Sequence, residues 1–229
     1  MTQKRILVIQ HIDIENPGII LDLMSKKGIS YDCVKIENNN LNLFDYDGLL
    51  IMGGPMSVNE KDQYSFIDTE IELVNHYLKL QKPILGICLG SQIIASALNS
   101  SIYKNSKQEL GWHDVSLSQT KDTIFENLEN NFLAFHWHGD IFNLPDNSIQ
   151  LASSKISNIQ AFVFKKQCYG ILFHLEVTKE IVQNIVNKFE SDLIFESIDK
   201  STILDELEEK IEKINFNGKI IFNRWLNLI

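Results

Sequence analysis

The sequence predicts an α/β fold of three layers, in which a mostly parallel, twisted sheet carries helices on both faces. Two patterns predict this class. Short aliphatic and β-branched segments alternate with segments of helical periodicity through the first part of the 229 residues. Further strand-like segments then follow one another until the chain becomes helical after Thr178. Strands that alternate with helices form right-handed βαβ units, which place the strands in parallel.

The first part is expected to contain four strands, at residues 5–10 (RILVIQ), 31–36 (YDCVKI), 47–52 (DGLLIM) and 83–87 (PILGI). The segment PGIILDLMSKKG predicts a helix between the first two strands. A second helix is expected before the fourth strand, because apolar side chains recur there at helical spacing, namely Phe66, Ile67, Ile71, Val74, Tyr77 and Leu78.

The later part contains five strand-like segments, HDVSLS, FLAFHWH, IQLASS, IQAFVFK and CYGILF, with little room for helices between them. We expect them to extend the same sheet in a mixed or antiparallel manner. The C-terminal segments KEIVQNIVNKFESDL, ILDELEEKIEKI and KIIFNRWLNLI are helical in pattern, and the last two are expected to form a cap or a subunit contact. Residues 1–190 therefore read as one domain, with residues 191–229 as a helical extension packed on it.

Composition excludes several classes of protein. The hydrophobic content of 44% and the charged content of 22% are ordinary for a globular domain. A net charge of −9 without a cluster of lysine and arginine argues against nucleic-acid binding. No apolar segment has the length of a signal peptide or a membrane span, which predicts a cytoplasmic protein. The 3 cysteines lack C-x-x-C spacing, so the sequence predicts neither a disulfide framework nor a zinc site, and we expect no cofactor. The sequence does not define the oligomeric state.

Cys88 lies between Gly86 and Gly90, where an apolar strand ends and the helical segment SQIIASAL begins. This is the context of a nucleophile elbow, in which small neighbours let the strand and the helix pass closely. The helix N-terminus would favour the thiolate of Cys88. The alternative is a small core cysteine.

The sequence also offers a candidate base and a loop whose backbone N–H groups could donate hydrogen bonds to a ligand. In extended chain the carboxylate of Glu176 can lie beside the imidazole of His174, which suits a base and its orienting group, although a single H-x-E is common. The strand at 47–52 runs into Gly53-Gly54-Pro55, where backbone N–H groups can face a ligand. The amide of Gly54, with that of Leu89 after the cysteine, could form an oxyanion hole. An ordinary strand-to-loop turn is the alternative for this segment.

The order and spacing of GGP, G-x-C-x-G-x-Q and H-x-E resemble the class I glutamine amidotransferases, especially free-standing members related to the glutaminase domain of GMP synthetase. The resemblance runs from Arg5 to about Glu190 and implies the flavodoxin-like fold of that family. It also implies a catalytic triad of Cys88, His174 and Glu176, with the Gly54 and Leu89 amides as the oxyanion hole. Further residues are implied to bind the substrate glutamine: Gly53, Gln92, His138, Gly139 and Asp140.

Two further segments invite comparison with this family. QELGWHDVSL resembles its E-x-G-W segment, so Glu109 and Trp112 are expected to shape or support the site. His136 and His138 alternate along a strand and could instead be a metal pair, but no third ligand cluster accompanies them in the sequence, and we expect no metal. The family's Q-F-H-P-E is here Leu172-Phe173-His174-Leu175-Glu176, which removes a glutamine and a proline. Without the proline, the contact between Glu176 and His174 is expected to be looser.

The resemblance implies an enzyme that hydrolyses the glutamine side-chain amide through a γ-glutamyl thioester on Cys88, giving glutamate and ammonia. In the family, ammonia passes to a synthetase domain. This sequence contains neither a P-loop nor an S-G-G-x-D-S pyrophosphate loop, so a separate acceptor subunit is expected. Two alternatives stay open: a γ-glutamyl peptide or amide hydrolase on the same scaffold, and a non-catalytic binding protein that retains the fold.

Overall fold

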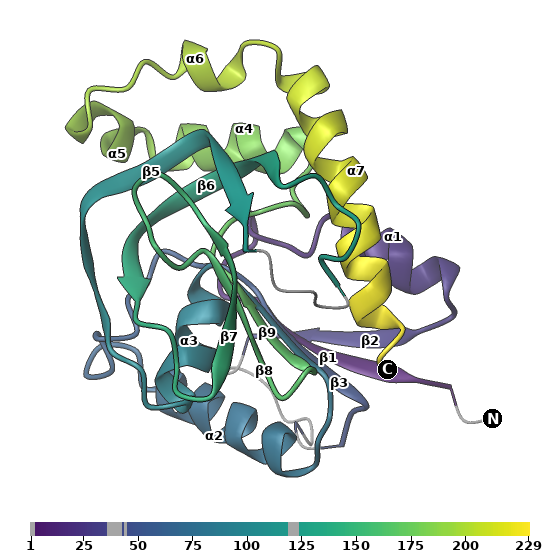
Figure 1. The fold of residues 1–229 in the computed structure, drawn as a ribbon. Coiled ribbons are helices and arrows are strands. Elements are labelled where there is room, and N and C mark those ends of the chain that lie inside the picture. Colours follow the sequence, from purple (N-terminus) through teal and green to yellow (C-terminus); the bar gives the residue numbers. More distant parts are fainter. Residues whose placement is uncertain (1–2, 36–42, 44, 119–123) are drawn as a thin grey trace.

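The computed structural model describes residues 3–35, 43, 45–118 and 124–229. Within these residues one sheet contains nine strands in the order β2-β1-β3-β4-β9-β8-β7-β5-β6 (Figure 1). The strands are β1 Arg5–Ile9, β2 Ser30–Val34, β3 Gly48–Ile51, β4 Ile84–Ile87, β5 Ile102–Leu117, β6 Asn131–Phe142, β7 Ser148–Ser153, β8 Ala161–Phe164 and β9 Cys168–Ile171. The expected strand at 31–36 corresponds to β2, and its residue 36 lies outside the described part of the chain.

The sheet has a parallel half and an antiparallel half. In the parallel half, β2, β1, β3, β4 and β9 run in the same direction. In the antiparallel half, each pairing among β9, β8, β7, β5 and β6 is antiparallel. The expected parallel first part and its antiparallel extension in one sheet are therefore confirmed. Among the described strands, four pairings are parallel and four antiparallel, so the sheet is more evenly mixed than expected.

Helices cover both faces of the sheet, and two cores result. The helices are α1 Ile19–Lys26, α2 Phe66–Lys79, α3 Leu89–Ala97, α4 Lys179–Lys188, α5 Glu190–Phe195, α6 Ser201–Leu204 and α7 Leu207–Leu226. Alternate residues of β1 point to opposite faces, as the strand period requires. Ile6 and Val8 pack with α1, α4 and α7, whereas Leu7 and Ile9 pack with α2 and α3. Figure 1 shows these two groups of helices on opposite sides of the sheet.

The C-terminal segments differ from the prediction. ILDELEEKIEKI and KIIFNRWLNLI were expected as separate helices, but one helix, α7, contains most of both, while Ile203 and Leu204 belong to α6. Glycine has a low helix propensity, yet Gly218 lies inside α7. The helix passes close to another segment at this position, which leaves no space for a side chain. A Cβ at this position would lie 2.5 Å from the carbonyl oxygen of Leu175. In the described part of the chain, no helix combines the length and apolar character needed to cross a membrane.

Strand order determines where polar groups gather. The strands β1, β3, β4 and β9 are consecutive neighbours in the sheet and parallel. The segments that follow them along the chain therefore meet at one edge, where ligands bind in open α/β sheets. These segments carry Glu15, Gly53-Gly54, Cys88 and His174.

Candidate active site

Cys88 occupies the tight turn between β4 and α3. It has a φ of 52° and a ψ of −111°, a backbone conformation rarely adopted by a residue with a side chain. Its flanking glycines allow the close approach predicted for an elbow. A Cβ at Gly86 would lie 2.4 Å from the backbone of Gly90, and one at Gly90 would lie 2.1 Å from the carbonyl oxygen of Ile51. The turn therefore requires both glycines and holds Cys88 in a strained conformation.

The thiol of Cys88 faces the pocket wall. Its Sγ lies 3.7 Å from the carbonyl oxygen of Trp137. Burial raises the pKa of Cys88, while His174 and the backbone of Leu89 partly offset this effect. The backbone N–H of Leu89 at the helix N-terminus thus favours the thiolate, but burial has the larger effect. A base that takes the proton is needed.

His174 and Glu176 follow β9 and form a buried pair. Nδ1 of His174 donates to Oε1 of Glu176 at 2.6 Å, and both side chains are 2% exposed. The N–H of Leu175 donates to the other oxygen, Oε2, at 3.1 Å. The expected loosening without a proline is wrong, because the leucine N–H itself holds the carboxylate. This arrangement directs Nε2 of His174 away from Glu176.

The surroundings of His174 make its imidazole a stronger base. Burial would lower the pKa of His174, but the Glu176 carboxylate, followed by Cys88, raises it well above the ordinary value. Nε2 of His174 is buried and has no hydrogen-bond partner among the described residues. Catalytic hydrogen bonds are often long in ligand-free sites. The imidazole is therefore placed to exchange a proton with the thiol of Cys88 or with a bound molecule.

The loop after β3 is held by a buried pair that the sequence did not reveal. Nδ1 of His11 donates to the carbonyl oxygen of Gly53 at 2.9 Å, and Nε2 donates to Glu70 at 3.0 Å. Both partners are acceptors, so both ring nitrogens carry hydrogens and the imidazole is charged. Burial would lower the pKa of His11, but Glu70 raises it above the ordinary value. This pair fixes the Gly53-Gly54 segment beside the elbow.

These elements border a pocket of about 340 Å³. Its lining includes residues expected at the site, namely Gly54, Cys88, Gln92, His138, Gly139 and Asp140. The side-chain amide of Gln92 donates to the carbonyl oxygen of Asp140 at 3.2 Å, and Ser57 Oγ donates to the Asp140 carboxylate at 2.5 Å. Gly53, Leu89, His174 and Glu176 are not in the lining and lie behind it. The parallel half thus contributes the elbow, and β5 and β6 contribute the opposite wall.

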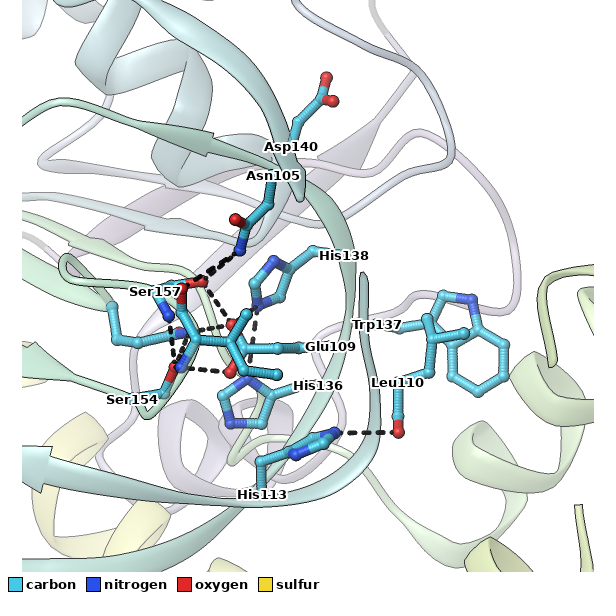
Figure 2. Close-up of polar contacts among 12 residues, drawn as sticks. Asn105, Glu109, Leu110, His113, His136, Trp137, His138, Asp140, Ser154 and Ser157 are labelled. Atoms are coloured by element: carbon cyan, nitrogen blue, oxygen red, sulfur yellow. Dashed lines mark hydrogen bonds and ion pairs between the residues drawn. The ribbon is translucent and has the colours of Figure 1, made fainter. Parts of the chain in front are cut away.

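Glu109 lies next to His136 and His138, which supplies the third group that was not apparent in the sequence (Figure 2). The candidate ligand atoms of these three residues lie within 4.8 Å of one another. Nδ1 of His136 is 3.3 Å from Nε2 of His138, which is 3.5 Å from Oε2 of Glu109. Burial, followed by the imidazole of His174, lowers the pKa of His138 to about 3. Two neutral imidazoles and a carboxylate have the composition of a zinc site.

Hydrogen bonds already engage the Glu109 carboxylate. Its Oε1 accepts from Ser154 Oγ at 2.5 Å, and its Oε2 accepts from Ser157 Oγ at 2.5 Å and Gln160 Nε2 at 2.8 Å. Both lone pairs of the oxygen nearest His138 are thus engaged. We therefore interpret the cluster as a hydrogen-bonded support that joins the β6 wall to the loop at 154–160. In Figure 2, Trp137 points away from this cluster, on the other side of β6.

The E-x-G-W segment contributes a second support. Trp112 packs edge-to-face on Phe135 of β6, with ring centroids 5.2 Å apart, and its Nε1 donates to the carbonyl oxygen of Ile203 at 2.9 Å. It connects the antiparallel half to α6 and is absent from the pocket lining. Both residues singled out in this segment, Glu109 and Trp112, thus lie behind the pocket wall.

Comparison with known proteins defines the class to which this site belongs. The family model for class-I glutamine amidotransferases matches residues 11–190. That match covers most of the 229 residues, so the chain belongs to the class I glutamine amidotransferase family.

Individual relatives agree with this assignment. The glutamine amidotransferase-like protein YfeJ of Salmonella typhimurium is 24% identical over 197 residues, which cover 82% of each chain. The GMP synthase of Borreliella burgdorferi strain N40 is 35% identical over 168 residues, which cover 71% of this chain and 31% of the synthase. The chain thus spans about a third of that relative. A crystal structure of a glutamine amidotransferase from Thermotoga maritima is similar over 99% of both chains, with a TM-score of 0.90 and 28% identity.

Proposed function

We propose that this chain hydrolyses the side-chain amide of glutamine, giving glutamate and ammonia through a γ-glutamyl thioester on Cys88. One observation carries the proposal. The strained Cys88 lines the pocket, the buried His174–Glu176 pair follows the adjacent parallel strand, and His174 lies near enough to Cys88 to lower the pKa of its thiol. A thiol, a base and a group that orients the base are the parts that nucleophilic amide hydrolysis requires.

In the first step, Nε2 of His174 takes the thiol proton and the sulfur of Cys88 attacks the amide carbon. The Gly54 and Leu89 amides stabilise the resulting oxyanion. When the C–N bond breaks, His174 returns the proton to the nitrogen, which leaves as ammonia. A water molecule then attacks the thioester with His174 as base, releasing glutamate and restoring the thiol. Glu176 holds the tautomer of His174 and stabilises its positive charge throughout.

The wall from β6, together with Gln92, receives the amino-acid end of the substrate. Gln92 and Asp140 contact each other, and Ser57 holds the Asp140 carboxylate. A carboxylate in this position suits the α-ammonium group of glutamine. His138 and Gly139 complete this side of the site, and Gly53 supports the opposite side, next to Gly54.

Ammonia from this chain serves an acceptor-activating subunit. The support is that the GMP synthase relative is named as glutamine-hydrolysing and extends well beyond the part that this chain spans. In such an arrangement, one chain hydrolyses glutamine and another uses the ammonia. We therefore expect a synthetase partner to increase the turnover of glutamine.

Ammonia release from glutamine by the purified chain tests the proposal, with Cys88→Ala as the comparison. Wild-type protein should release ammonia and the variant should not, because no other described cysteine lines the pocket. Cys33→Ser, which changes an exposed thiol, is the matched control and should retain activity. Release that survives in Cys88→Ala would refute the assignment. A parallel series of γ-glutamyl peptides separates glutamine hydrolysis from a γ-glutamyl amide hydrolase.

A glutamine-mimicking electrophile provides a second readout that does not need turnover. It should modify Cys88 covalently, as mass spectrometry of the intact and digested protein can show. Absence of modification at Cys88, together with no hydrolysis, would instead identify a non-catalytic binding protein.

A further inference from the structure

Glu15 is a buried carboxylate that the mechanism above does not use. It lies in the segment between β1 and α1, lines the pocket together with Cys88, and is 9% exposed. Among the residues that the structure describes, none donates a hydrogen bond to its carboxylate. Buried carboxylates are normally paired or hydrogen-bonded, because removing their charge from water is costly.

The other carboxylates of the pocket have donors. Glu60 accepts from the N–H of Ser57 at 2.9 Å, and Asp192 accepts from Nε1 of Trp137 at 3.1 Å. Asp140 accepts from the hydroxyl of Ser57 at 2.5 Å. Glu15 differs from these three in having no such donor among the described residues, and it borders the same pocket.

Gly53 lies beside both Glu15 and the imidazole of His174. A Cβ at Gly53 would lie 2.1 Å from Oε2 of Glu15 and 3.4 Å from Cε1 of His174. The carboxylate and the imidazole therefore lie close together at this glycine. Any larger residue at position 53 would displace the carboxylate. Glycine is therefore needed here to leave space for Glu15, and not for its conformational freedom.

Glu15 opposes the charge on the nucleophile, since its carboxylate raises the pKa of Cys88. A group that disfavours the thiolate does not serve to activate it. The Glu15 carboxylate can stabilise the reaction only at a step in which positive charge or an N–H donor is present beside it. In the proposed reaction, that step is the departure of the amide nitrogen, to which His174 gives its proton.

We propose that the carboxylate of Glu15 contacts the leaving nitrogen, accepting a hydrogen bond from its N–H and stabilising the positive charge that develops as the C–N bond breaks. This inference rests on the proposed function. The proton balance is unchanged: His174 supplies the single proton, the sulfur keeps the acyl group, and ammonia or a primary amine leaves. Glu15 then selects γ-glutamyl compounds whose leaving group carries an N–H, rather than esters.

The position favours the leaving nitrogen over the α-ammonium group of the substrate. The imidazole of His174 must reach the leaving nitrogen, and Glu15 lies beside that imidazole. The β6 wall of the pocket has its own carboxylate, that of Asp140, which accepts from Ser57 Oγ. Two carboxylates thus serve two different nitrogen atoms.

The experiment compares glutamine with its γ-methyl ester, which has the same acyl group but no N–H on the leaving atom. Glu15→Gln should reduce kcat/KM for glutamine by about 10- to 100-fold, as expected for the loss of a hydrogen bond to a charged group. The ester should be hydrolysed at close to the wild-type rate. Asp192→Asn is the matched control, because it removes another pocket carboxylate, and it should change both substrates alike. Equal losses on amide and ester in Glu15→Gln would overturn the inference and leave the proposed function standing.

A second measurement uses only wild-type protein and so does not depend on the folding of a variant. γ-Glutamyl N-ethylamide and γ-glutamyl N,N-dimethylamide are isomers, and only the first has an N–H. Wild-type protein should hydrolyse the N-ethylamide at least about 10-fold faster. Equal rates would overturn the inference. If wild-type protein hydrolyses none of these compounds and Cys88 is not acylated, the proposed function fails, and this inference fails with it.

Discussion

Glu176 accepts a hydrogen bond on each of its oxygens, from Nδ1 of His174 and from the N–H of Leu175. Proline has no N–H, so the leucine provides a contact that the expected proline could not provide. A glutamine at position 176 would place its NH₂ group opposite either Nδ1–H of His174 or the N–H of Leu175, so that two donors would face each other. The charge and the second acceptor are therefore both needed to hold the imidazole.

The pair predicts a pH-dependent stability. The pKa of His174 is raised in the folded protein, so its contribution is fully present below about pH 6.5, the unfolded value, and is lost as the pH rises through the folded value. Glu176→Gln, made in Cys88→Ala protein to remove the thiol, should therefore cost more free energy of unfolding at pH 6 than at pH 9. Urea unfolding at the two pH values measures the difference.

Glu180→Gln is the control for this measurement, because Glu180 is exposed at the start of α4. Its effect should be small and nearly equal at both pH values. An equal cost of Glu176→Gln at pH 6 and pH 9 would show that the pKa of His174 is not raised by this carboxylate.

Individual polar residues near the N-terminus were not predicted as part of the site. His11, Glu15 and Glu70 belong to no recognised motif, and Glu70 lies on a helix face that reads as amphipathic. The available signal was the polar segment HIDIEN directly after a buried strand. This segment lies at the site because β1 pairs with β3, and that pairing could not be predicted from the sequence. The elbow glycines and the pairing of His174 with Glu176 were predictable because local spacing carries their geometry, whereas the combination of Cys88 with His174 followed from the family resemblance.

Helix α7 contacts the segment that contains His174 and Glu176 through the side chain of Asn215. Nδ2 of Asn215 donates to the carbonyl oxygens of Leu175 and Val177, at 3.1 Å and 3.0 Å. One turn further along the helix, Gly218 touches the Leu175 carbonyl. The helix therefore satisfies backbone acceptors on both sides of Glu176.

This contact predicts the effect of Gly218→Ala. Helix propensity alone would predict a gain of about 1 kcal/mol. We expect a loss of about 1–3 kcal/mol instead, because the new Cβ would lie 2.5 Å from the Leu175 oxygen and force the segments apart. Thermal unfolding measures the change.

Lys219→Ala is the control, because Lys219 is exposed on the same helix and its replacement should change stability by less than about 0.5 kcal/mol. Stabilisation by Gly218→Ala would contradict the close approach of α7 to Leu175.

Strand β5 shows why part of the fold escaped prediction. The sequence predicted a strand only at HDVSLS, but β5 begins at Ile102 and includes the polar segment YKNSKQEL. This part pairs with β6 alone, with an irregular register between Lys104 and Glu109, and much of it faces solvent. Without alternating apolar residues, the strand period is not visible. The parallel strands β1, β3 and β4 were found because they are largely buried on both faces and form continuous apolar runs. The edge strand β2 is only partly buried and was found from the segment YDCVKI.

The whole chain should unfold as one unit, with residues 191–229 as part of it. Trp225 of α7 is 0% exposed and belongs to the same core as α1 and β6. We therefore expect Trp225→Ala to lower the free energy of unfolding by about 3–5 kcal/mol. A single transition, shifted to lower denaturant for both fluorescence and circular dichroism, is the expected outcome.

Phe216→Ala is the matched control, because Phe216 lies on the same helix and is 67% exposed. It should leave the transition nearly unchanged. A separate early transition in Trp225→Ala, with the remainder unfolding as in wild type, would show that the C-terminal segment unfolds independently.

The two halves of the sheet make different contributions to one pocket. The segments after β1, β3, β4 and β9 carry Cys88, His174 and the groups beside them, whereas the facing wall comes from β5 and β6. The chemistry and the shape of the cavity are thus encoded in separate stretches of the chain. Under the proposed function, substrate preference can diverge by changes in β5 and β6 while Cys88 and His174 stay in place. A hybrid that exchanges only those two strands between relatives would then transfer selectivity and keep the reacting groups.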